Sequence, residues 1–243
     1  MDLGLEGRTA LVTASSKGLG RGSALALAAE GANLVLAARG KEALDATARE
    51  VEAAGVEVLA IPCDVTDPDT PRRLVDAAVD RFGRVDVLVG NSGGPPPARA
   101  LDVDDESLNK ALNANLLTHI RLVKAVVPHM RTEGWGRICL ITSSFIKQPN
   151  PALALSNTAR TGLWAWAKTA AQDLFDDGIT LNLACPGLHA TDRMKELGTG
   201  SGGEPMGDPE DFGKVVAFLC SEAANFVSGA ALQVDGARTA ALL

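Results

Sequence analysis

The residues best suited to chemistry follow a short apolar run in the second half of the chain. Ser143 comes directly after the run 137–142, and Lys147 lies four residues further on. A hydroxyl at the end of a buried strand can donate a hydrogen bond to a substrate carbonyl and stabilise the negative charge that develops there. A partly desolvated lysine ammonium can donate a proton, although most lysines in such positions are simply solvated.

A glycine-containing loop near the N-terminus is suited to bind phosphate. Residues 13–20 read TASSKGLG and stand between an apolar run and a predicted helix. Glycines let backbone N–H groups approach a diphosphate, and the N-terminus of the helix adds partial positive charge. A pair of glycines is weak evidence by itself, so the loop gains meaning only from the elements around it.

The predicted elements would bring these residues to one edge of a sheet. Apolar runs such as 34–38 alternate with longer helical runs, and the strands are continuously apolar. This pattern is typical of a parallel sheet covered by helices on both faces, with ligands at the C-terminal strand ends. We therefore expect an α/β fold, a doubly wound, mostly parallel Rossmann-type sheet in a single domain over residues 1–243. The predicted strands are 9–13, 33–38, 56–62, 85–90, 137–142, 179–184 and 231–234, and the predicted helices are 19–30, 41–54, 71–82, 107–130, 156–176 and 209–221.

Composition and charge exclude several classes of protein. With 46% hydrophobic and 22% charged residues, the chain is typical of a globular protein and has no apolar stretch that could span a bilayer. A net charge of −7 without a basic run argues against nucleic acid as a partner. The acidic N-terminus is unlike a secretory signal, and four widely spaced cysteines indicate free thiols, so we expect a cytoplasmic protein. Neither metal-ligand spacing nor a nucleophile elbow occurs, so we expect no metal site and no serine hydrolase.

The motifs of the first half resemble those of the short-chain dehydrogenase/reductase family. The glycine loop is similar to the family's TGxxxGxG loop, with Ala14 in place of the first glycine. Asp64-Val65 resembles the family's adenine contact, and Asn91-Ser92-Gly93 stands where the family has NAG. Asn115 matches the asparagine of the family's active-site helix.

The resemblance continues in register through the second half. Ser143 matches the family's catalytic serine, Pro186-Gly187 followed by Thr191 resembles its PG…T segment, and residues 234–236 resemble its VDGG. This resemblance implies the family's fold and a bound nicotinamide dinucleotide. The implied cofactor-binding residues are Thr13, Ser15, Ser16, Lys17, Gly18, Leu19, Gly20, Arg39, Asp64, Val65, Asn91, Ser92, Gly93, Arg160, Pro186, Gly187, His189 and Thr191.

The charge after the second predicted strand bears on the choice of cofactor. An acid at this point would bind the ribose 2′-hydroxyl of NAD, but this strand is followed by Arg39. Lys17 adds a second cation from the glycine loop. Two cations suit the 2′-phosphate of NADP, so we expect NADP (NADPH), unless Arg39 is only a solvated loop cation.

The family's Tyr-x-x-x-Lys pair is missing from this chain. Ser156 stands thirteen residues after Ser143, in the place of the tyrosine, and Arg160 replaces the lysine. The chain contains no tyrosine at all, and an aliphatic hydroxyl is shorter and much less acidic than a phenol. Arg160 could bind ribose hydroxyls but cannot relay a proton, and a purely structural role is its alternative.

Three sources could replace the tyrosine as proton donor, namely Lys147, His189 or water. We favour Lys147 because it lies in the same loop as Ser143. His189 is expected to contribute only its backbone. Asn115 is expected to need a polar partner or a water, with a plain core position as the alternative. His119 and His129 are expected to be packing or surface residues.

Together these features predict an NADP(H)-dependent oxidoreductase that reduces a small or acyl carbonyl substrate. It would be similar to 3-oxoacyl-[acyl-carrier-protein] reductases but with an atypical proton donor, and a catalytically silent dinucleotide-binding sensor or scaffold is the alternative. The family resemblance implies a homotetramer or homodimer packed through the helices of Asn115 and Arg160. The glycine-rich segment 197–207 is expected to be mobile and to cover the substrate, or else to be a plain surface loop. The predicted catalytic residues are Ser143, Asn115, Ser156, Arg160 and Lys147.

Overall fold

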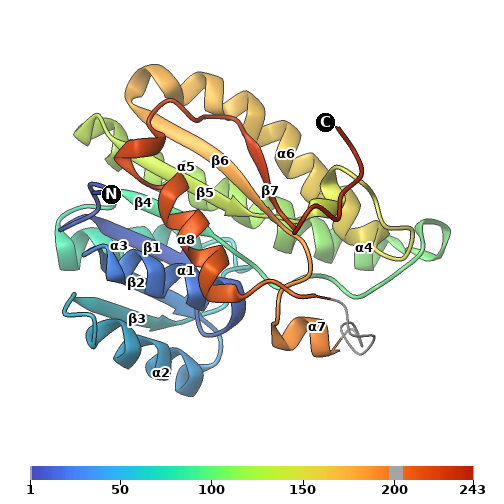
Figure 1. Cartoon of the computed structure of the whole chain (residues 1–243), viewed down its shortest axis with the longest axis horizontal. Helices are drawn as coiled ribbons and strands as arrows, with labels where there is room; N and C mark the ends of the chain where they lie inside the picture. The colour runs from blue at the N-terminus through green and yellow to red at the C-terminus, as the bar shows by residue number, and fades with distance from the viewer. Residues whose placement is uncertain (1, 197–204, 243) are drawn as a thin grey trace.

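The computed structural model describes residues 2–196 and 205–242, and within them seven parallel strands form one sheet (Figure 1). The strand order is β3-β2-β1-β4-β5-β6-β7, so the direction of winding reverses between β1 and β4. This confirms the expected doubly wound α/β fold, in which ligands bind at the C-terminal ends of the strands near that reversal. The strands are β1 (Thr9–Thr13), β2 (Asn33–Ala38), β3 (Val58–Pro62), β4 (Val87–Gly90), β5 (Gly136–Ile141), β6 (Ile179–Pro186) and β7 (Ala231–Val234).

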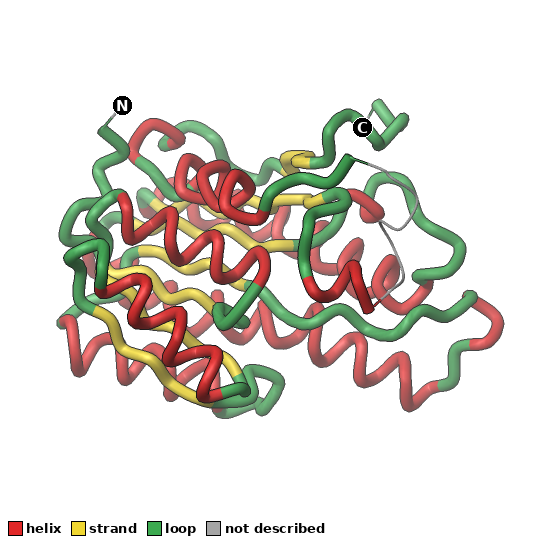
Figure 2. Tube along the Cα trace, turned by 60° about the horizontal axis from the view of Figure 1, so that its bottom comes forward, coloured by secondary structure: helices red, strands yellow, loops and turns green. Residues whose placement is uncertain are grey.

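Helices cover both faces of the sheet, and the sheet divides the hydrophobic core into two layers (Figure 2). Apolar residues of α1, α2 and α8 pack on one face, and those of α3, α5 and α6 pack on the other. Because the strands are buried on both sides, their continuous apolar runs are what this arrangement requires. None of the helices in the described residues is long and apolar enough to cross a membrane. The helices are α1 (Gly18–Ala29), α2 (Lys41–Glu52), α3 (Thr70–Phe82), α4 (Asp105–Leu112), α5 (Thr118–Glu133), α6 (Ala154–Leu174), α7 (Asp192–Glu196) and α8 (Pro209–Leu219).

The predicted helix 107–130 is interrupted, which corrects the expectation of a single element. A π-helical turn at Asn113–Leu117 separates α4 from α5. The side-chain amide of Asn113 donates to the carbonyl of Thr66 at 3.0 Å, and the hydroxyl of Thr118 donates to the carbonyl of Asn113 at 2.8 Å. These side-chain bonds compete with the regular helical ladder, and such turns occur often at functional sites.

Helices α1 and α8 approach each other so closely that their contact requires glycine on both sides. A Cβ on Gly22 would lie 2.1 Å from the carbonyl oxygen of Pro209, and a Cβ on Gly213 would lie 2.1 Å from that of Gly22. Since α1 begins at the glycine loop, this contact fixes that loop and the start of α1 against α8.

Replacing Gly213 by alanine should therefore destabilise the protein although alanine favours helices. We expect the free energy of unfolding to fall by about 1–3 kcal/mol, because the backbones must separate to admit the methyl group. Gly162, inside α6, is the matched control, since a Cβ there lies no closer than 3.7 Å to Leu116. Gly162→Ala should leave stability unchanged or raise it by up to about 1 kcal/mol, as measured by urea unfolding. Equal effects of the two substitutions would contradict the close-contact argument.

Candidate active site

The glycine loop leaves the N-terminus of α1 open to an anion. Lys17, the N-cap residue, makes no side-chain capping bond, and the first turn carries no acidic residue. A Cβ on Gly20 would lie 2.3 Å from the carbonyl oxygen of Ala14, so only glycine permits this tight entry into the helix. The N–H groups of the first turn lack helical partners and lie at the positive end of the helix dipole. The loop thus fits the diphosphate of a dinucleotide.

Hydrogen bonds fix this loop to the neighbouring strands. The hydroxyl of Thr13 donates to the carbonyl of Asn91 at 2.7 Å and accepts from its N–H at 2.8 Å. The hydroxyl of Ser15 accepts from the N–H of Ala37 at 3.1 Å. Thr13 and Ser15 are both fully buried, so their side chains join the ends of β1, β2 and β4.

Of the groups expected around the 2′-phosphate and the adenine, Arg39 follows β2, Asp64 and Val65 follow β3, and Lys17 precedes α1. Arg39 is exposed, and Lys17 pairs with Asp192 of α7 at 3.7 Å. Hydrogen bonds from Thr66 hold the pKa of Asp64 below its usual value, and the charge of Arg39 contributes to the same direction. Val65 beside it is buried. Lys17 is therefore held by α7, a helix that the sequence did not predict.

Ser143 and Lys147 lie in the loop that leaves β5. Ser143 caps a 3-10 turn over Ser144–Ile146, and its hydroxyl accepts from the N–H of Phe145 at 3.2 Å. The ammonium of Lys147 lies over the ring of Trp164 in α6, 5.8 Å from its centroid. Its charge also acts on the buried thiol of Cys185 near the end of β6. Lys147 therefore reaches back toward the sheet edge instead of extending into solvent.

Arg160 places its charge inside the protein beneath this loop. Its Nη1 donates to the carbonyl oxygens of Ile141 at 3.0 Å and Thr142 at 2.9 Å. Burial lowers the pKa of Arg160 to about 10; the Cys185 thiol opposes this shift, and the charge of Arg193 adds to it. Arg160 thus supports the main chain next to Ser143, and Ser156 lies partly buried one turn earlier on α6.

Asn115 lies in the π-helical turn and has a polar partner from the loop after β4. Its Oδ1 accepts from the hydroxyl of Ser92 at 3.3 Å, and its side-chain amide is 3.5 Å from the carbonyl of Ala111. The side chain is buried. Asn115 therefore connects the π-helical turn to the segment Asn91-Ser92-Gly93, where the dinucleotide is expected.

The segment after β6 turns back onto the glycine loop. A Cβ on Gly18 would lie 3.3 Å from Cγ2 of Thr191, so Thr191 packs on the phosphate loop. The ring of His189 packs edge-on against Phe212 at 5.1 Å, and burial lowers its pKa. His189 also pairs through its backbone with Gly207. Residues 197–204 of the expected glycine-rich covering segment lie outside the described residues.

Helix α7 brings a residue to the site that the sequence analysis missed. The Nη2 of Arg193 donates to the carbonyl oxygen of Pro95 at 2.7 Å, in the loop after β4. The helix spans only five residues and has no apolar periodicity that could have revealed it. The sequence could have indicated Arg193 by its position, because it stands two residues after Thr191 of the segment that matches the family's PG…T.

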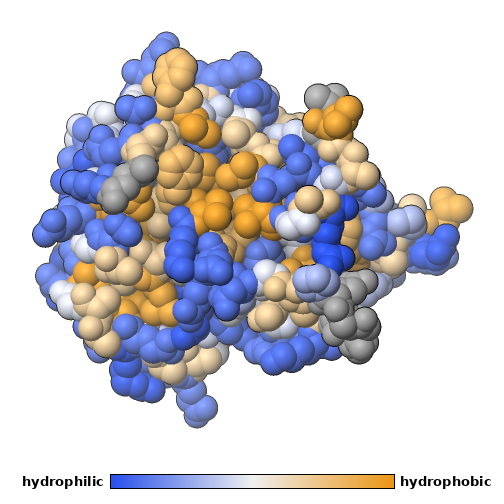
Figure 3. All heavy atoms as spheres, viewed as in Figure 1, coloured by the Kyte–Doolittle hydropathy of each residue, from blue (hydrophilic) through white to orange (hydrophobic). Residues whose placement is uncertain are grey.

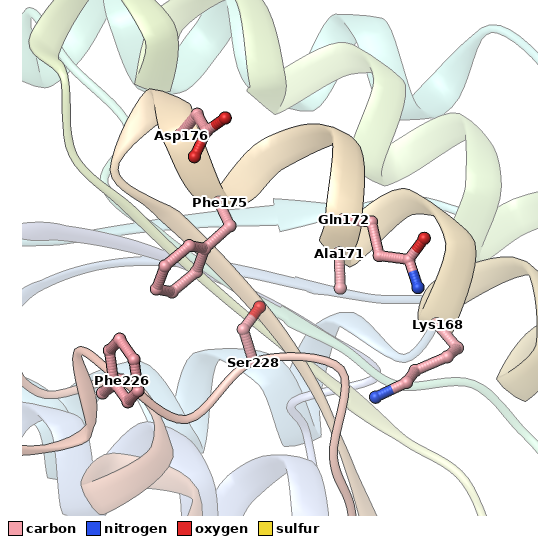
Figure 4. A pocket seen from close by; sticks show the side chains of 7 residues that line it. All are labelled: Lys168, Ala171, Gln172, Phe175, Asp176, Phe226 and Ser228. Carbon is pink, nitrogen blue, oxygen red and sulfur yellow. The ribbon is translucent and has the colours of Figure 1, made fainter.

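A shallow pocket of about 400 Å³ lies elsewhere, between the C-terminal end of α6 and the segment that carries Phe226 and Ser228 (Figure 4). Phe175 and Phe226 form one wall, with their rings edge-to-face and their centroids 5.7 Å apart. None of its lining residues belongs to the predicted site, so this pocket is not the candidate active site. In the part of the chain that the structure describes, no group of three His, Cys, Asp or Glu side chains could hold a metal ion.

A sequence profile described as Enoyl-(Acyl carrier protein) reductase matches residues 13–237. The chain belongs to the short-chain dehydrogenase/reductase family. Dehydrogenase/reductase SDR family member 4 from Sus scrofa is 33% identical over 96% of this chain and 87% of that protein. A 3-oxoacyl-[acyl-carrier-protein] reductase from Synechocystis is 34% identical over 96% of this chain and 97% of that protein. The structure of L-sorbose reductase from Gluconobacter frateurii, complexed with NADPH and L-sorbose, is 32% identical, with a TM-score of 0.90 over 97% of this chain and 98% of that one.

Membership of this family of nicotinamide-dependent oxidoreductases also explains the backbone at Ala14. Ala14 has a φ of +47°, in the left-handed region that side chains rarely adopt. The family's first loop glycine would occupy this position without strain. The loop therefore keeps the family's backbone path despite the substitution.

His119 is the second residue whose environment the sequence did not reveal. It is completely buried, and neither ring nitrogen has a hydrogen-bond partner among the described residues. The ring packs against Gly90, where a Cβ would lie 3.1 Å from its Cδ2. Burial lowers the pKa of His119 to about 3, and the charge of Arg160 adds to the shift. The imidazole is therefore neutral at physiological pH.

This neutral histidine should make stability depend on pH. Below its ordinary pKa of 6.5, His119 binds a proton in the unfolded chain but not in the folded one. The free energy of unfolding therefore decreases as the pH falls from 6.5 toward about 3. The expected slope is up to about 1.4 kcal/mol per pH unit. His119→Leu should flatten the decline of unfolding free energy between pH 6.5 and pH 4, while His129→Leu on the same helix should not. Parallel curves for the parent and His119→Leu would contradict this prediction.

Proposed function

We propose that this protein is an NADP(H)-dependent oxidoreductase that reduces a small or acyl carbonyl substrate, as 3-oxoacyl-[acyl-carrier-protein] reductases do. The observation that carries the proposal is the common position of two features at one sheet edge. The open N-terminus of α1 follows β1, while Ser143, Lys147 and Arg160 meet around the end of β5. A dinucleotide on the first feature would extend toward the second.

The cofactor would be held by the residues around the glycine loop and the neighbouring strand ends. When bound, the reduced nicotinamide supplies a hydride to the carbonyl carbon. The diphosphate would bind at the α1 N-terminus, and Lys17 and Arg39 would bind the 2′-phosphate. The NADPH in the solved L-sorbose reductase supports this choice of nicotinamide. The adenine and nicotinamide sides would be bounded by Asp64, Val65, Asn91, Ser92, Gly93, Pro186, Gly187, the backbone of His189, and Thr191.

The chain's own residues would divide the work at the carbonyl. Ser143 would donate a hydrogen bond to the carbonyl oxygen, and the buried charge of Arg160 would stabilise the alkoxide that forms. Lys147 would donate the proton from Nζ, because Ser156 is too weak an acid and Arg160 holds its protons. Asn115 would hold the loop after β4 in place through Ser92.

A catalytically silent dinucleotide-binding protein is the second candidate. It is favoured by one observation, the absence of tyrosine from the whole sequence. Binding of NADPH at micromolar levels without turnover of any carbonyl in a broad panel would establish it. Turnover by the parent protein would exclude it.

We also propose a cytoplasmic homotetramer or homodimer without nucleic-acid or membrane partners. Apolar side chains gather in the middle of the face shown in Figure 3, over β7 and the adjoining segments. Phe218 of α8, Phe226, Leu232 of β7 and Leu117 of the π-helical turn are large apolar side chains that are exposed. Burial of these side chains against a second copy would remove apolar surface from water.

The role predicted for the cations Lys17 and Arg39 at the 2′-phosphate can be tested by binding measurements alone. NADPH should bind more tightly than NADH by about 1–3 kcal/mol, and Arg39→Ala should remove most of that difference. Arg49→Ala, an exposed cation of α2, is the control and should leave the difference intact. Isothermal titration would measure the affinity of each of the three proteins for both nucleotides, and equal binding of the two nucleotides by the parent would refute the NADP assignment.

The proton donor can be tested by removing the ammonium of Lys147 while keeping the length of its side chain. Lys147→Met should lower kcat by about 10²–10⁴-fold and leave NADPH affinity unchanged, because only proton transfer is lost. Lys124→Met, exposed on α5, should keep the parent kcat. Unchanged turnover in Lys147→Met would exclude Lys147, and a loss confined to His189→Gln would assign the role to the histidine.

A further inference from the structure

Residues 235–242, here called the strap, connect two sides of the candidate active site. The strap begins beside the segment expected at the nicotinamide, since a Cβ on Gly187 would lie 2.7 Å from the Cβ of Asp235. Further along, the N–H of Ala240 donates to Oε1 of Gln148 at 2.7 Å, and Figure 1 shows this red part of the chain beside the loop after β5. Gln148 directly follows the proposed proton donor. The strap therefore passes from the expected position of the nicotinamide to that of the donor.

The course of the strap is fixed by its own backbone and by a third segment. Ala237 has a φ of +63°, in the left-handed region that side chains rarely adopt. Asp235 holds this turn by accepting from the N–H groups of Ala237 at 3.0 Å and Thr239 at 2.9 Å. The Nη2 of Arg238 donates to the carbonyl oxygen of Pro205 at 3.1 Å. Because such backbone strain persists only where its surroundings impose it, the folded site determines the path of the strap.

One side of the strap faces the protein. Thr239 and Ala241 are half-buried, whereas Arg238, Ala240 and Leu242 are exposed. Side chains of an extended segment point alternately to its two sides, so the small side chains of Thr239 and Ala241 point inward. The strap thus presents small side chains and main chain to the space beneath it.

The contact at Gln148 is the part of the strap that can open most easily. Gln148 and Ala240 are both exposed, and so is the hydrogen bond between them. Exposed hydrogen bonds with little apolar burial around them open at a lower free energy than those of the core. The strap can therefore open at this contact while it stays anchored at Asp235.

We propose that the strap is the wall that limits the size of the carbonyl substrate, and that Gln148 is the positioning residue that holds this wall closed. The inference rests on the proposed function and narrows its substrate class to carbonyls with a small substituent on the side of the strap. A small substituent fits beneath the closed strap, whereas a bulky one requires it to open. The apparent affinity for a bulky carbonyl is then reduced by the fraction of molecules in which the strap is open.

The experiment compares two ketones, acetophenone and benzophenone, at saturating NADPH. Acetophenone can turn its methyl group toward the strap, but benzophenone carries a phenyl group on both sides. Gln148→Ala should raise kcat/KM for benzophenone about 3- to 10-fold and change that for acetophenone by less than about twofold, because losing one hydrogen bond shifts the opening equilibrium by this factor. A chain that ends at Gly236 should show a larger gain with the same selectivity.

Two control variants show whether the hydrogen bond itself matters. Gln148→Glu keeps an oxygen that can accept from Ala240, so its ratio of kcat/KM values for the two ketones should equal that of the parent. Gln172→Ala removes an exposed glutamine of α6 outside the candidate site and should also behave as the parent does. A change of the ratio in Gln172→Ala equal to that in Gln148→Ala would overturn the inference.

Hydrogen exchange and ligand binding separate failure of this inference from failure of the proposed function. The amide hydrogens of residues 235–242 should exchange faster in Gln148→Ala than in the parent. If neither ketone is turned over, both are titrated into the protein–NADPH complex, and tighter binding of benzophenone alone in Gln148→Ala supports the inference although the proposed function fails. Unchanged exchange, or equal effects on the two ketones while they are still reduced, would overturn the inference and leave the proposed function intact. Failure of either ketone to bind the complex would refute both.

Discussion

The guanidinium of Arg160 lies inside the protein on the carbonyl oxygens of Ile141 and Thr142, and the site is built around that buried charge. A buried cation is tolerable only where hydrogen bonds compensate the loss of water. The two carbonyls belong to the chain just before Ser143, so the same bonds that satisfy Arg160 also fix the serine. Burial and the nearby charge of Arg160 keep the imidazole of His119 neutral.

This arrangement differs in physical terms from the family's tyrosine–lysine pair. A lysine is a mobile point charge with three donors, whereas an arginine has a planar fork that holds fixed partners. In this chain, one end of the fork is occupied by main-chain oxygens, so Arg160 combines a supporting role with its charge. In the proposed function the proton would then come from another donor, and Lys147 is the candidate, since its ammonium lies over the ring of Trp164 and its charge acts on Cys185.

Much of the fold followed from local patterns, because continuous apolar runs such as 34–38 are typical of strands that are covered on both faces. The predicted strands and most helices agree with the structure within a few residues. The broken helix at Asn113 was not predictable, because its cause is a bond to Thr66, far away in the sequence. The burial of His119 depends in the same way on the space left by Gly90.

The candidate site was predictable to a different degree at each position. Motif spacing selected Ser143, Asn115 and the glycine loop as candidates, and the structure places them after β5, in the π-helical turn and before α1. Motif spacing gave no information on the partners of side chains, such as Asp192 for Lys17. Arg193 was not predicted because a five-residue helix carries no periodic pattern. Its hydrogen bond to Pro95 also depends on a loop that follows a different strand.

The backbone pairing of His189 with Gly207 has a consequence for how such proteins diversify. Ala190 donates to the carbonyl of Gly207 at 2.9 Å, and Gly207 donates to that of Leu188 at 2.9 Å. The chain therefore leaves and rejoins the domain at one fixed point, with α7 inside the excursion. Insertions, deletions or whole exchanges between residues 190 and 206 could be accepted without disturbing the sheet. Thr191 and Asp192 at the start of this excursion contact Gly18 and Lys17 of the glycine loop, so an exchange of the segment between relatives would have to keep these two residues for the glycine loop to retain its surroundings.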